Sequence, residues 1–351
     1  MAKILDIRQF LEKLKDTPAV DVRSPKEFAQ GHIPKAVNLP IFTNEERAIV
    51  GTLYKQKGRE EAIIKGLELI GAKMADFVRT AKLIAPDKKI LVHCWRGGMR
   101  SGSMAWLFET VGFQTFTLEK GYKNYRRYIL HFFAQTSFPL LIVGGMTGSG
   151  KTDILKEIVK LGEQGIDLEG LAHHKGSSFG SIGQAPQPTT EQFENDLFLY
   201  FQQFLHSQEG KIEGNKKIWL EDESRGIGTV YLPENLWRQM QHSPVICVQL
   251  PKNLRIERLV KEYAFCDKSL LISAVNRIRK RLGHERADDA IKALAIDDFA
   301  KVADITLAYY DKAYSHDISR RKPESVFYLP INEDNPLETA KEVIQAAKRY
   351  Q

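Results

Sequence analysis

The sequence predicts an α/β protein with two consecutive domains, each built around a parallel sheet. Short apolar runs alternate with helical stretches along the chain, which is the pattern of repeated strand–helix–strand units. The 351 residues exceed the usual size of one domain. Two glycine-rich loops, at residues 93–101 and 145–152, each follow an apolar run and precede a helical stretch. In parallel sheets such loops lie at the carboxyl ends of strands, where active sites form.

The composition is typical of a folded protein in a reducing compartment. Hydrophobic residues make up 43% of the chain and charged residues 27%. The three cysteines, Cys94, Cys247 and Cys266, are too few for a disulfide framework and too scattered for a zinc site. Because no apolar run reaches membrane-spanning length and no signal-peptide pattern is present, we expect a cytoplasmic protein without a membrane partner.

The net charge of +7 is unevenly distributed. Residues 1–137 carry 23 basic and 14 acidic side chains, whereas the remaining residues carry 28 and 30. A second basic stretch, residues 252–286, has 10 basic and 4 acidic side chains. Nucleic acid is the first polyanion to expect as a partner, although a solvated lysine-rich surface explains the charge equally well.

The first domain is expected over residues 1–134, and its elements follow one another closely. Residues 19–23 predict a short buried strand. Ser24 as N-cap, Pro25 at the first position and Glu27 in a capping box predict a helix that ends near Gly31. Further strands are expected at 36–40, 90–92 and 113–118, with a helical stretch over about 45–83 and Gly121-Tyr122 closing the unit.

The loop after the strand at 90–92 reads HCWRGGMRS and leads into a helix that we expect to open near Ser101. The first N–H groups of that helix and its dipole favour the thiolate form of Cys94. Two glycines let the loop curl around an anion, and two arginines add positive charge. The loop therefore predicts a reactive thiolate, with a buried strand-end cysteine as the alternative. The candidate catalytic residues are Cys94, Arg96, Gly97, Gly98 and Arg100.

Residues 5–130 contain motifs that resemble the rhodanese family. These are Asp21-Val22-Arg23, the pattern Phe28-x-x-Gly31-His32-Ile33-Pro34-x-Ala36-x-Asn38-Leu39-Pro40, and the Cys94 loop. The resemblance implies that Cys94 carries a persulfide or an analogous chalcogen. Arg100 lies six residues after Cys94, one more than in the usual rhodanese loop, so the anion site should be wider and suit a tetrahedral group. The same spacing fits cysteine phosphatases, including those with a rhodanese fold, which remain an alternative.

The second domain is expected over residues 138–351 and opens on a phosphate-binding loop. Residues 138–143 predict an apolar strand, and residues 153–161 predict an amphipathic helix. Between them lies G-x4-G-K-T in the context that a P-loop requires. We expect its backbone N–H groups to hold a diphosphate, its lysine to neutralise the terminal phosphate, and its threonine to ligate Mg²⁺. The residues assigned to this site are Gly145, Gly148, Ser149, Gly150, Lys151 and Thr152.

A second acidic motif fits the same domain. Residues 218–223 read as a strand ending in acids, so Asp222 or Glu221 would hold a metal-bound water, and Asp222 joins Thr152 as a candidate Mg²⁺ ligand. A solvated strand end is an equally common explanation. Strands are also expected at 245–250 and 326–329, and a closing helix at 337–350.

Three other stretches have two readings each. Residues 173–181, rich in glycine and serine, are typical of a substrate loop or of an ordinary surface loop. The basic residues of 252–286 would bind a phosphate backbone or form a solvated helix face. An aromatic-rich helical stretch would line an apolar pocket or, more simply, pack in the core; its members are Phe193, Phe198, Tyr200, Phe201 and Phe204.

Taken together, five segments resemble the bacterial tRNA 2-selenouridine synthase family over nearly the whole chain. They are residues 94–101, 144–152, 167–172, 176–180 and 221–225. The resemblance implies that selenium from selenophosphate replaces sulfur in wobble 2-thiouridine of tRNAs for Lys, Glu and Gln. It also implies that the thiouridine is first S-geranylated from geranyl diphosphate, and that the geranylthio group is then displaced. Cys94 would carry the selenium, the P-loop would bind the diphosphate, and an enzyme that supplies selenophosphate would be a partner.

Other functions compete with this one. The P-loop would bind nucleotide in an ATP-dependent rhodanese-type sulfurtransferase. The Cys94 loop would hydrolyse phosphate esters in a cysteine phosphatase. A non-catalytic RNA-binding module would use only the basic surface.

Overall fold

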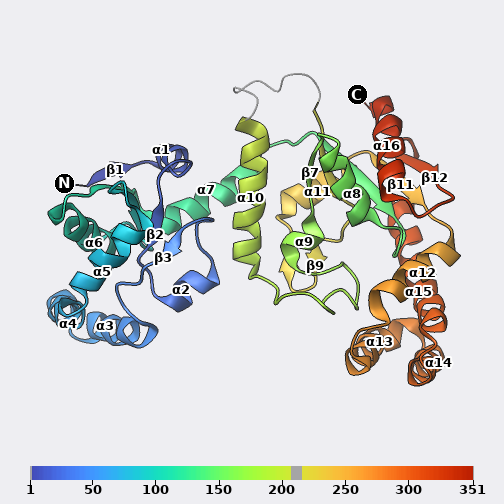
Figure 1. Cartoon of the computed structure of the whole chain (residues 1–351), viewed down its shortest axis with the longest axis horizontal. Coiled ribbons are helices and arrows are strands. Elements are labelled where there is room, and N and C mark those ends of the chain that lie inside the picture. The colour runs from blue at the N-terminus through green and yellow to red at the C-terminus, as the bar shows by residue number, and fades with distance from the viewer. Residues whose placement is uncertain (1, 207–215, 351) are drawn as a thin grey trace. The chain divides into compact units, whose positions relative to one another are not determined.

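The structure, a computed structural model, describes residues 2–206 and 216–350. It divides the chain into two compact units, Met1–Phe132 and Phe133–Gln351 (Figure 1). Each unit contains a five-stranded sheet whose pairings are all parallel. The α/β class and the order of the two domain types are therefore as the sequence predicted.

The sheet of the first unit has the strand order β1-β5-β4-β2-β3. Its strands are β1 (Lys3–Leu5), β2 (Ala19–Asp21), β3 (Val37–Asn38), β4 (Lys89–His93) and β5 (Gln114–Leu118). The helices are α1 (Ile7–Lys13), α2 (Pro25–Gln30), α3 (Asn44–Gln56), α4 (Arg59–Gly71), α5 (Met74–Ile84), α6 (Met99–Thr110) and α7 (Gly121–Gln135). The sequence analysis did not predict β1 or α1. A three-residue edge strand such as β1 shows no clear periodicity.

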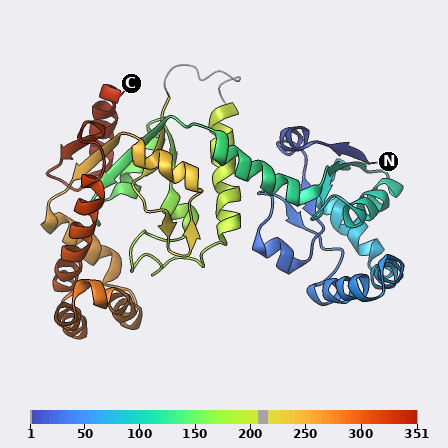
Figure 2. The same ribbon diagram turned by 180° about the vertical axis from the view of Figure 1, so that it is seen from behind.

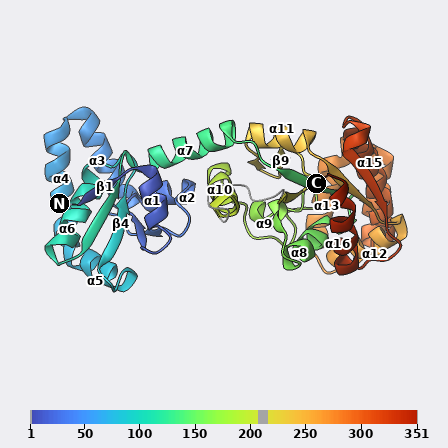
Figure 3. The same ribbon diagram turned by 90° about the horizontal axis from the view of Figure 1, so that it is seen from above.

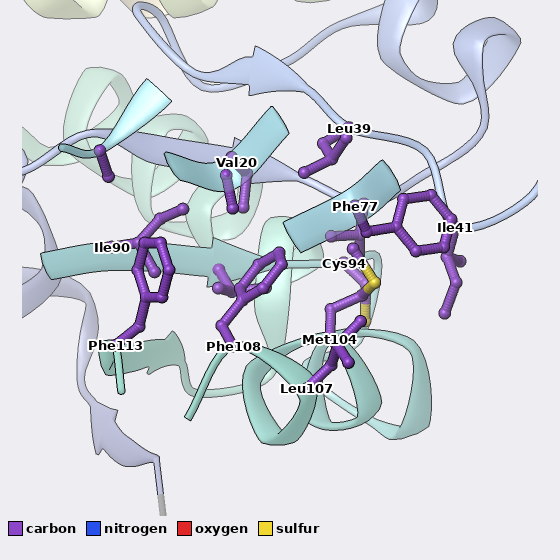
Figure 4. Close-up of a cluster of buried hydrophobic side chains, with 14 of the residues drawn as sticks. Val20, Leu39, Ile41, Phe77, Ile90, Cys94, Met104, Leu107, Phe108 and Phe113 are labelled. Atoms are coloured by element: carbon purple, nitrogen blue, oxygen red, sulfur yellow. The ribbon is translucent and has the colours of Figure 1, made fainter. Parts of the chain in front are cut away.

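Helices cover both faces of this sheet. On one face, strand residues such as Val20 and Val92 pack against Phe77 of α5 and Phe108 of α6 (Figure 4). On the other face lie α1 and α7; Phe10 of α1 makes an edge contact with the ring of His93. Figure 3 shows α6 and α1 on opposite sides of β4. Both faces are buried, which explains why β4 reads as a continuous apolar run.

Two element boundaries differ from the predictions. Helix α6 begins at Met99, with Gly98 as its N-cap, rather than near Ser101. Gly121 does not close the unit but begins α7, which continues to Gln135, past the predicted end of the first domain at residue 134. The buried residues Tyr122, Tyr125, Ile129 and Phe133 recur at helical spacing, which is the signal for this helix. The predicted capping box at Ser24 and Glu27 is confirmed.

The sheet of the second unit has the strand order β12-β11-β6-β8-β7. Its strands are β6 (Leu140–Gly145), β7 (Gln164–Ile166), β8 (Ile218–Glu221), β11 (Val245–Gln249) and β12 (Val326–Pro330), and β9 (Gly226–Ile227) pairs with β10 (Val230–Tyr231) separately. The α-helices are α8 (Lys151–Lys160), α9 (Leu168–Ala172), α10 (Thr190–His206), α11 (Glu234–His242), α12 (Lys252–Tyr263), α13 (Lys268–Leu282), α14 (His284–Ala295), α15 (Phe299–Ser319) and α16 (Pro336–Ala347). Two short 3₁₀ turns are η1 (Pro323–Ser325) and η2 (Lys348–Tyr350).

Two clusters of buried apolar side chains can be followed among the described residues of this unit. In the first, α8 and α16 pack against β6, β8 and β11 through residues such as Ile158, Val343 and Val248. The second cluster lies among α13, α14 and α15, and Phe179, from the loop between α9 and α10, is inserted into it. Figures 1 and 2 show α13 and α14 side by side, away from the sheet. Within the described residues, no helix has the length and hydropathy needed to cross a membrane.

Candidate active sites

The first candidate site is the loop between β4 and α6. The amide of Tyr122 donates a hydrogen bond to the carbonyl of Cys94 (2.8 Å), and that of Lys123 donates to the carbonyl of Trp95 (3.0 Å). Gly97 has φ +64°, and a Cβ there would lie 2.6 Å from a carbonyl oxygen of β5. Glycine is therefore required at this position. The two hydrogen bonds join the beginning of the loop, Cys94 and Trp95, to the start of α7.

The Cys94 side chain is buried. The residue is 3% exposed, and its sulfur lies 3.2 Å from the Ser101 hydroxyl oxygen. Its side chain packs in the core with residues such as Phe77 and Met104 (Figure 4). Of the two sequence interpretations, a reactive thiolate in an anion-binding loop and a buried strand-end cysteine, the structure has the sulfur in the buried position. The exposed part of the loop runs from Arg96 to Met99.

The two arginines of the loop have different surroundings. Arg96 is exposed, and its side chain makes no hydrogen bond or ion pair within the described part of the chain. Arg100 donates two hydrogen bonds to the carboxylate of Glu27, at 2.7 and 3.3 Å. Burial opposes ionisation of Glu27, but its bonds with Arg100 hold the pKa below the usual range. Arg96 is thus available to an anion, whereas Arg100 is held by Glu27.

Beneath the loop lies a buried charged pair from the Asp21-Val22-Arg23 motif. Arg23 donates a 2.6 Å hydrogen bond to Asp21, and its guanidinium lies 3.8 Å from the ring centroid of Tyr122. His93 is fully buried 3.8 Å from Asp21. Burial, helped by the Arg23 charge, outweighs the attraction of Asp21 and lowers the pKa of His93 to about 4, so the imidazole is neutral near pH 7. These side chains support the loop from below rather than lining it.

The second candidate site is the loop between β6 and α8. Gly150, the N-cap of α8, has the left-handed φ of +78°, and a Cβ there would lie 3.0 Å from the Arg258 guanidinium. The Lys151 ammonium donates to the carbonyl of Gly145 at 3.2 Å. The Ser149 hydroxyl is buried and has no hydrogen-bond partner. A helix N-terminus, a lysine and an unpaired hydroxyl around one loop form the arrangement that binds phosphate.

The acidic residues beside this loop are arranged differently from the prediction. The Thr152 hydroxyl donates to Glu169 of α9 at 2.7 Å. Asp222 instead accepts hydrogen bonds from Arg321 (2.7 Å) and from the Tyr314 hydroxyl (3.1 Å). Sequence reasoning missed Glu169, Tyr314 and Arg321 as parts of the site. The only signal for Glu169 was its place in the 167–172 motif.

Two carboxyl groups near the loop are protonated more readily than usual. Burial, followed by the neighbouring Glu169 charge, raises the pKa of Glu223 well above its ordinary value. Burial and nearby acids also raise the pKa of Glu221, although that carboxyl accepts the Leu168 amide at 2.9 Å. A cation bound between Thr152 and these acids would offset their mutual repulsion. The residues present therefore fit a Mg²⁺ ion held by few protein ligands and by substrate phosphates.

A cavity of about 690 Å³ begins at the P-loop. Its polar end is formed by the P-loop, Glu169, Asp222 and Glu223, and its apolar end by residues of α13–α15. Gly176, Ser177 and Phe179 of the predicted substrate loop line it. The aromatic residues Phe193, Phe198 and Phe201 do not; they are at most 1% exposed and belong to the core.

Several basic residues of the stretch 252–286 are paired with acids. Arg255 is 4% exposed and forms a 2.7 Å ion pair with Asp311. Arg258 pairs with Asp153 and Asp334, and Arg279 pairs with Asp288. These three arginines hold helices of the second unit together, whereas Lys261, Lys280 and Arg286 are exposed, so both interpretations of the rest of the stretch stay open.

Comparison with known proteins gives matches to both units. The family model described as the tRNA 2-selenouridine synthase AAA domain matches residues 138–335, and the rhodanese-like domain model matches residues 6–128. A protein of Sulfurovum sp. named tRNA 2-selenouridine synthase is 34% identical over 347 residues, covering 90% of this chain and 92% of that protein. A protein of the same name from Nitrosomonas europaea is 36% identical over 274 residues, covering 77% and 68%.

Among solved structures, the N-terminal domain of a protein from Clostridium difficile 630 is 40% identical. The match covers 36% of this chain and 99% of that chain, with a TM-score of 0.34. The family model that matches over half of the chain and the relatives that match along most of it agree. This chain belongs to the tRNA 2-selenouridine synthase family.

Proposed function

We propose that this protein is a transferase that converts wobble 2-thiouridine in tRNA to 2-selenouridine, with selenophosphate as selenium donor and S-geranyl-2-thiouridine as intermediate. The observation that carries the proposal is the cavity that joins a P-loop to an apolar wall within one unit. Geranyl diphosphate has a diphosphate at one end and a hydrocarbon chain at the other, so it matches both ends of this cavity. The family to which the chain belongs supports the tRNA substrate.

The first step is alkylation of sulfur at the P-loop. The thiocarbonyl sulfur of the base attacks C1 of geranyl diphosphate, the C1–O bond breaks, and diphosphate leaves with the bonding electrons. Lys151, the loop amides and the N-terminus of α8 stabilise the charge that develops on the leaving group. Thr152 and Glu169 would hold Mg²⁺, which would add positive charge there.

The second step uses the Cys94 loop. The Cys94 thiolate adds to C2 of the S-geranylated ring, the C2–S bond breaks, and geranylthiolate leaves and takes a proton. The selenium of selenophosphate then adds to C2 and displaces the Cys94 thiolate, and water cleaves the P–Se bond, so that phosphate is released and no oxidant or reductant is needed. For this attack the Cys94 side chain must rotate from the core toward the exposed Gly97–Gly98 side of the loop. The barrier includes the contact with Ser101 at 3.2 Å and the packing of the buried sulfur. Arg96, exposed and unpaired within the described chain, can hold an oxyanion of selenophosphate.

The tRNA would contact the first unit. The excess of positive charge lies in residues 1–137, and three arginines of the second basic stretch, Arg255, Arg258 and Arg279, are paired with acids. Lys123 and Arg96 are both exposed, and the Lys123 amide donates to the carbonyl of Trp95, the residue before Arg96. We assign the wobble position of tRNAs for Lys, Glu and Gln as the target.

The experiment combines binding with product analysis. Calorimetry with the full chain measures affinity for geranyl diphosphate and for ATP, and mass spectrometry follows S-geranyl-2-thiouridine in an anticodon stem–loop. We expect binding of geranyl diphosphate and formation of the S-geranyl product. Binding of ATP alone would favour the ATP-dependent sulfurtransferase, and hydrolysis of an aryl phosphate that depends on Cys94 would favour the phosphatase. A Cys266→Ala variant is the matched control for thiol loss, because Cys266 lies at the end of α12 in neither candidate site.

A further inference from the structure

One face of α15 follows the cavity for most of the helix. The lining residues recur every three or four positions, as expected for one side of a helix. They are Phe299, Val302, Ala303, Thr306, Leu307, Tyr310, Ala313, Tyr314 and Asp317. Helix α15 therefore runs alongside the cavity from its apolar end to its polar end.

The polar end of this face is fixed by a hydrogen bond. The Tyr314 hydroxyl accepts the amide of Gly145, the first P-loop residue, at 2.8 Å. An α-helix rises about 1.5 Å per residue, so Tyr310 lies about 6 Å and Ala303 about 16 Å along the axis from Tyr314. The distance of a residue on this face from the diphosphate site therefore increases from Tyr314 toward the start of α15.

The 175–180 loop is hydrogen-bonded to both α15 and α13. The Ser178 amide donates to the Tyr310 hydroxyl at 3.0 Å, and the Ser178 hydroxyl donates to the carbonyl of Ala274 in α13 at 2.9 Å. Leu271 and Leu294 close the cavity from α13 and α14. Both are at most 2% exposed and belong to a packed core, so this end cannot widen without disturbing that core.

Ala303 has the smallest side chain on the apolar part of this face. It is 7% exposed and lines the cavity one turn before Thr306. A larger side chain here would occupy space that a hydrocarbon chain needs, while leaving the P-loop, about ten helical residues away, unchanged.

We propose that Ala303 sets the length of the prenyl chain that the cavity accepts, as a specificity-determining residue on the α15 face. The proposal rests on the proposed function, because it takes a prenyl diphosphate as the occupant. Continuity of the apolar wall with the P-loop in one cavity supports that occupant.

The test compares dimethylallyl, geranyl and farnesyl diphosphate as donors for the full-length protein with a 2-thiouridine anticodon stem–loop. The variant is Ala303→Phe, and Ala308→Phe is the matched control, because Ala308 is exposed on the same helix and does not line the cavity. We expect Ala303→Phe to lower kcat/KM for geranyl diphosphate about tenfold or more relative to dimethylallyl diphosphate, since pockets discriminate single carbon units by roughly that factor. Ala308→Phe should keep the wild-type ratio.

The outcomes separate the proposal from the function on which it rests. Unchanged donor ratios in Ala303→Phe, or equal losses with both donors, would overturn the role of Ala303 while leaving prenyl transfer intact. Failure of the wild-type protein to use any prenyl diphosphate would overturn both. Circular dichroism and the thermal midpoint check folding; if Ala303→Phe is unfolded, Ala303→Val and Ala303→Leu replace it, and a graded loss with side-chain size is then required.

Discussion

Replacing Tyr314 by phenylalanine tests the connection between the P-loop and α15. The Tyr314 hydroxyl accepts a 2.8 Å hydrogen bond from Gly145 and donates a 3.1 Å bond to Asp222. Asp222 keeps its 2.7 Å bond from Arg321 when the hydroxyl is removed. The Gly145 amide, at the buried end of β6, loses the acceptor that Tyr314 provides.

The magnitude follows from that single unpaired amide. A buried donor without a partner costs about 1–3 kcal/mol, and the carboxylate that loses one of two donors adds little because its charge remains paired. We therefore expect the second unit to lose about 1–3 kcal/mol of unfolding free energy. Affinity for geranyl diphosphate should fall as well, because Gly145 begins the loop that holds the diphosphate.

Urea unfolding of the full chain, followed by tryptophan fluorescence and far-ultraviolet circular dichroism, measures the first effect, and calorimetry measures the second. Tyr231→Phe is the control, since Tyr231 is 54% exposed in β10, and its loss should change stability by less than about 0.5 kcal/mol. Equal stability and equal affinity of wild type and Tyr314→Phe would refute the role given to this hydrogen bond.

Three further outcomes are expected. Lys151→Ala should weaken geranyl diphosphate binding by about 10- to 150-fold in calorimetry, because one charged hydrogen-bonding group is lost. Unchanged affinity would contradict the P-loop assignment. Because the folded-state pKa of His93 is about 4, the folded protein binds fewer protons than the unfolded chain between pH 4 and 6.5, so stability falls as pH falls through this window. Denaturant unfolding at several pH values should show that the wild-type protein loses about 3 kcal/mol of unfolding free energy over this window and that His93→Phe does not. The same pH dependence of stability in the wild-type protein and in His93→Phe would argue against a buried neutral imidazole. Arg96→Gln combined with Lys123→Gln should reduce the slope of log affinity for tRNA against log salt by about two. Lys82→Gln on α5 is the control. An equal reduction of the slope by Lys82→Gln would show that the effect does not depend on the Cys94 loop.

The sequence identified features that are contiguous in the chain. The P-loop was predictable because its glycines, lysine and threonine are adjacent and stand between a strand and a helix. The capping box at Ser24 was predictable for the same reason. The fold class followed from the alternation of apolar runs and helices, which both parallel sheets confirm.

Features that depend on tertiary contacts were not predictable. Glu169 and Tyr314 lie 17 and 162 residues after Thr152, and only the fold brings Glu169 to its hydroxyl and Tyr314 to the start of the P-loop. The apolar wall of α15 has the same three- and four-residue spacing as any core helix, so the sequence does not distinguish a cavity wall from packing. The same spacing left a pocket and core packing open for Phe193 and its neighbours, and the structure bears out core packing, the simpler interpretation, for Phe193, Phe198 and Phe201.

Burial of the Cys94 sulfur is the main departure from the predicted site. The glycines and the positive charge of the loop are visible in its sequence, but the conformation of the Cys94 side chain is not. That side chain can also pack in the core beside Met104, as it does in the structure. The pairing of Arg100 with Glu27 likewise depends on α2, which lies more than seventy residues earlier in the chain.

The central claim is that selenium transfer to tRNA depends on the Cys94 thiol, and the most direct measurement is mass spectrometry of wobble nucleosides from cells that depend on this protein and are supplied with selenium. The account predicts 2-selenouridine with the wild-type protein and with Cys266→Ala. With Cys94→Ala it predicts no 2-selenouridine, together with accumulation of S-geranyl-2-thiouridine. Wild-type levels of 2-selenouridine in the Cys94→Ala cells would contradict it.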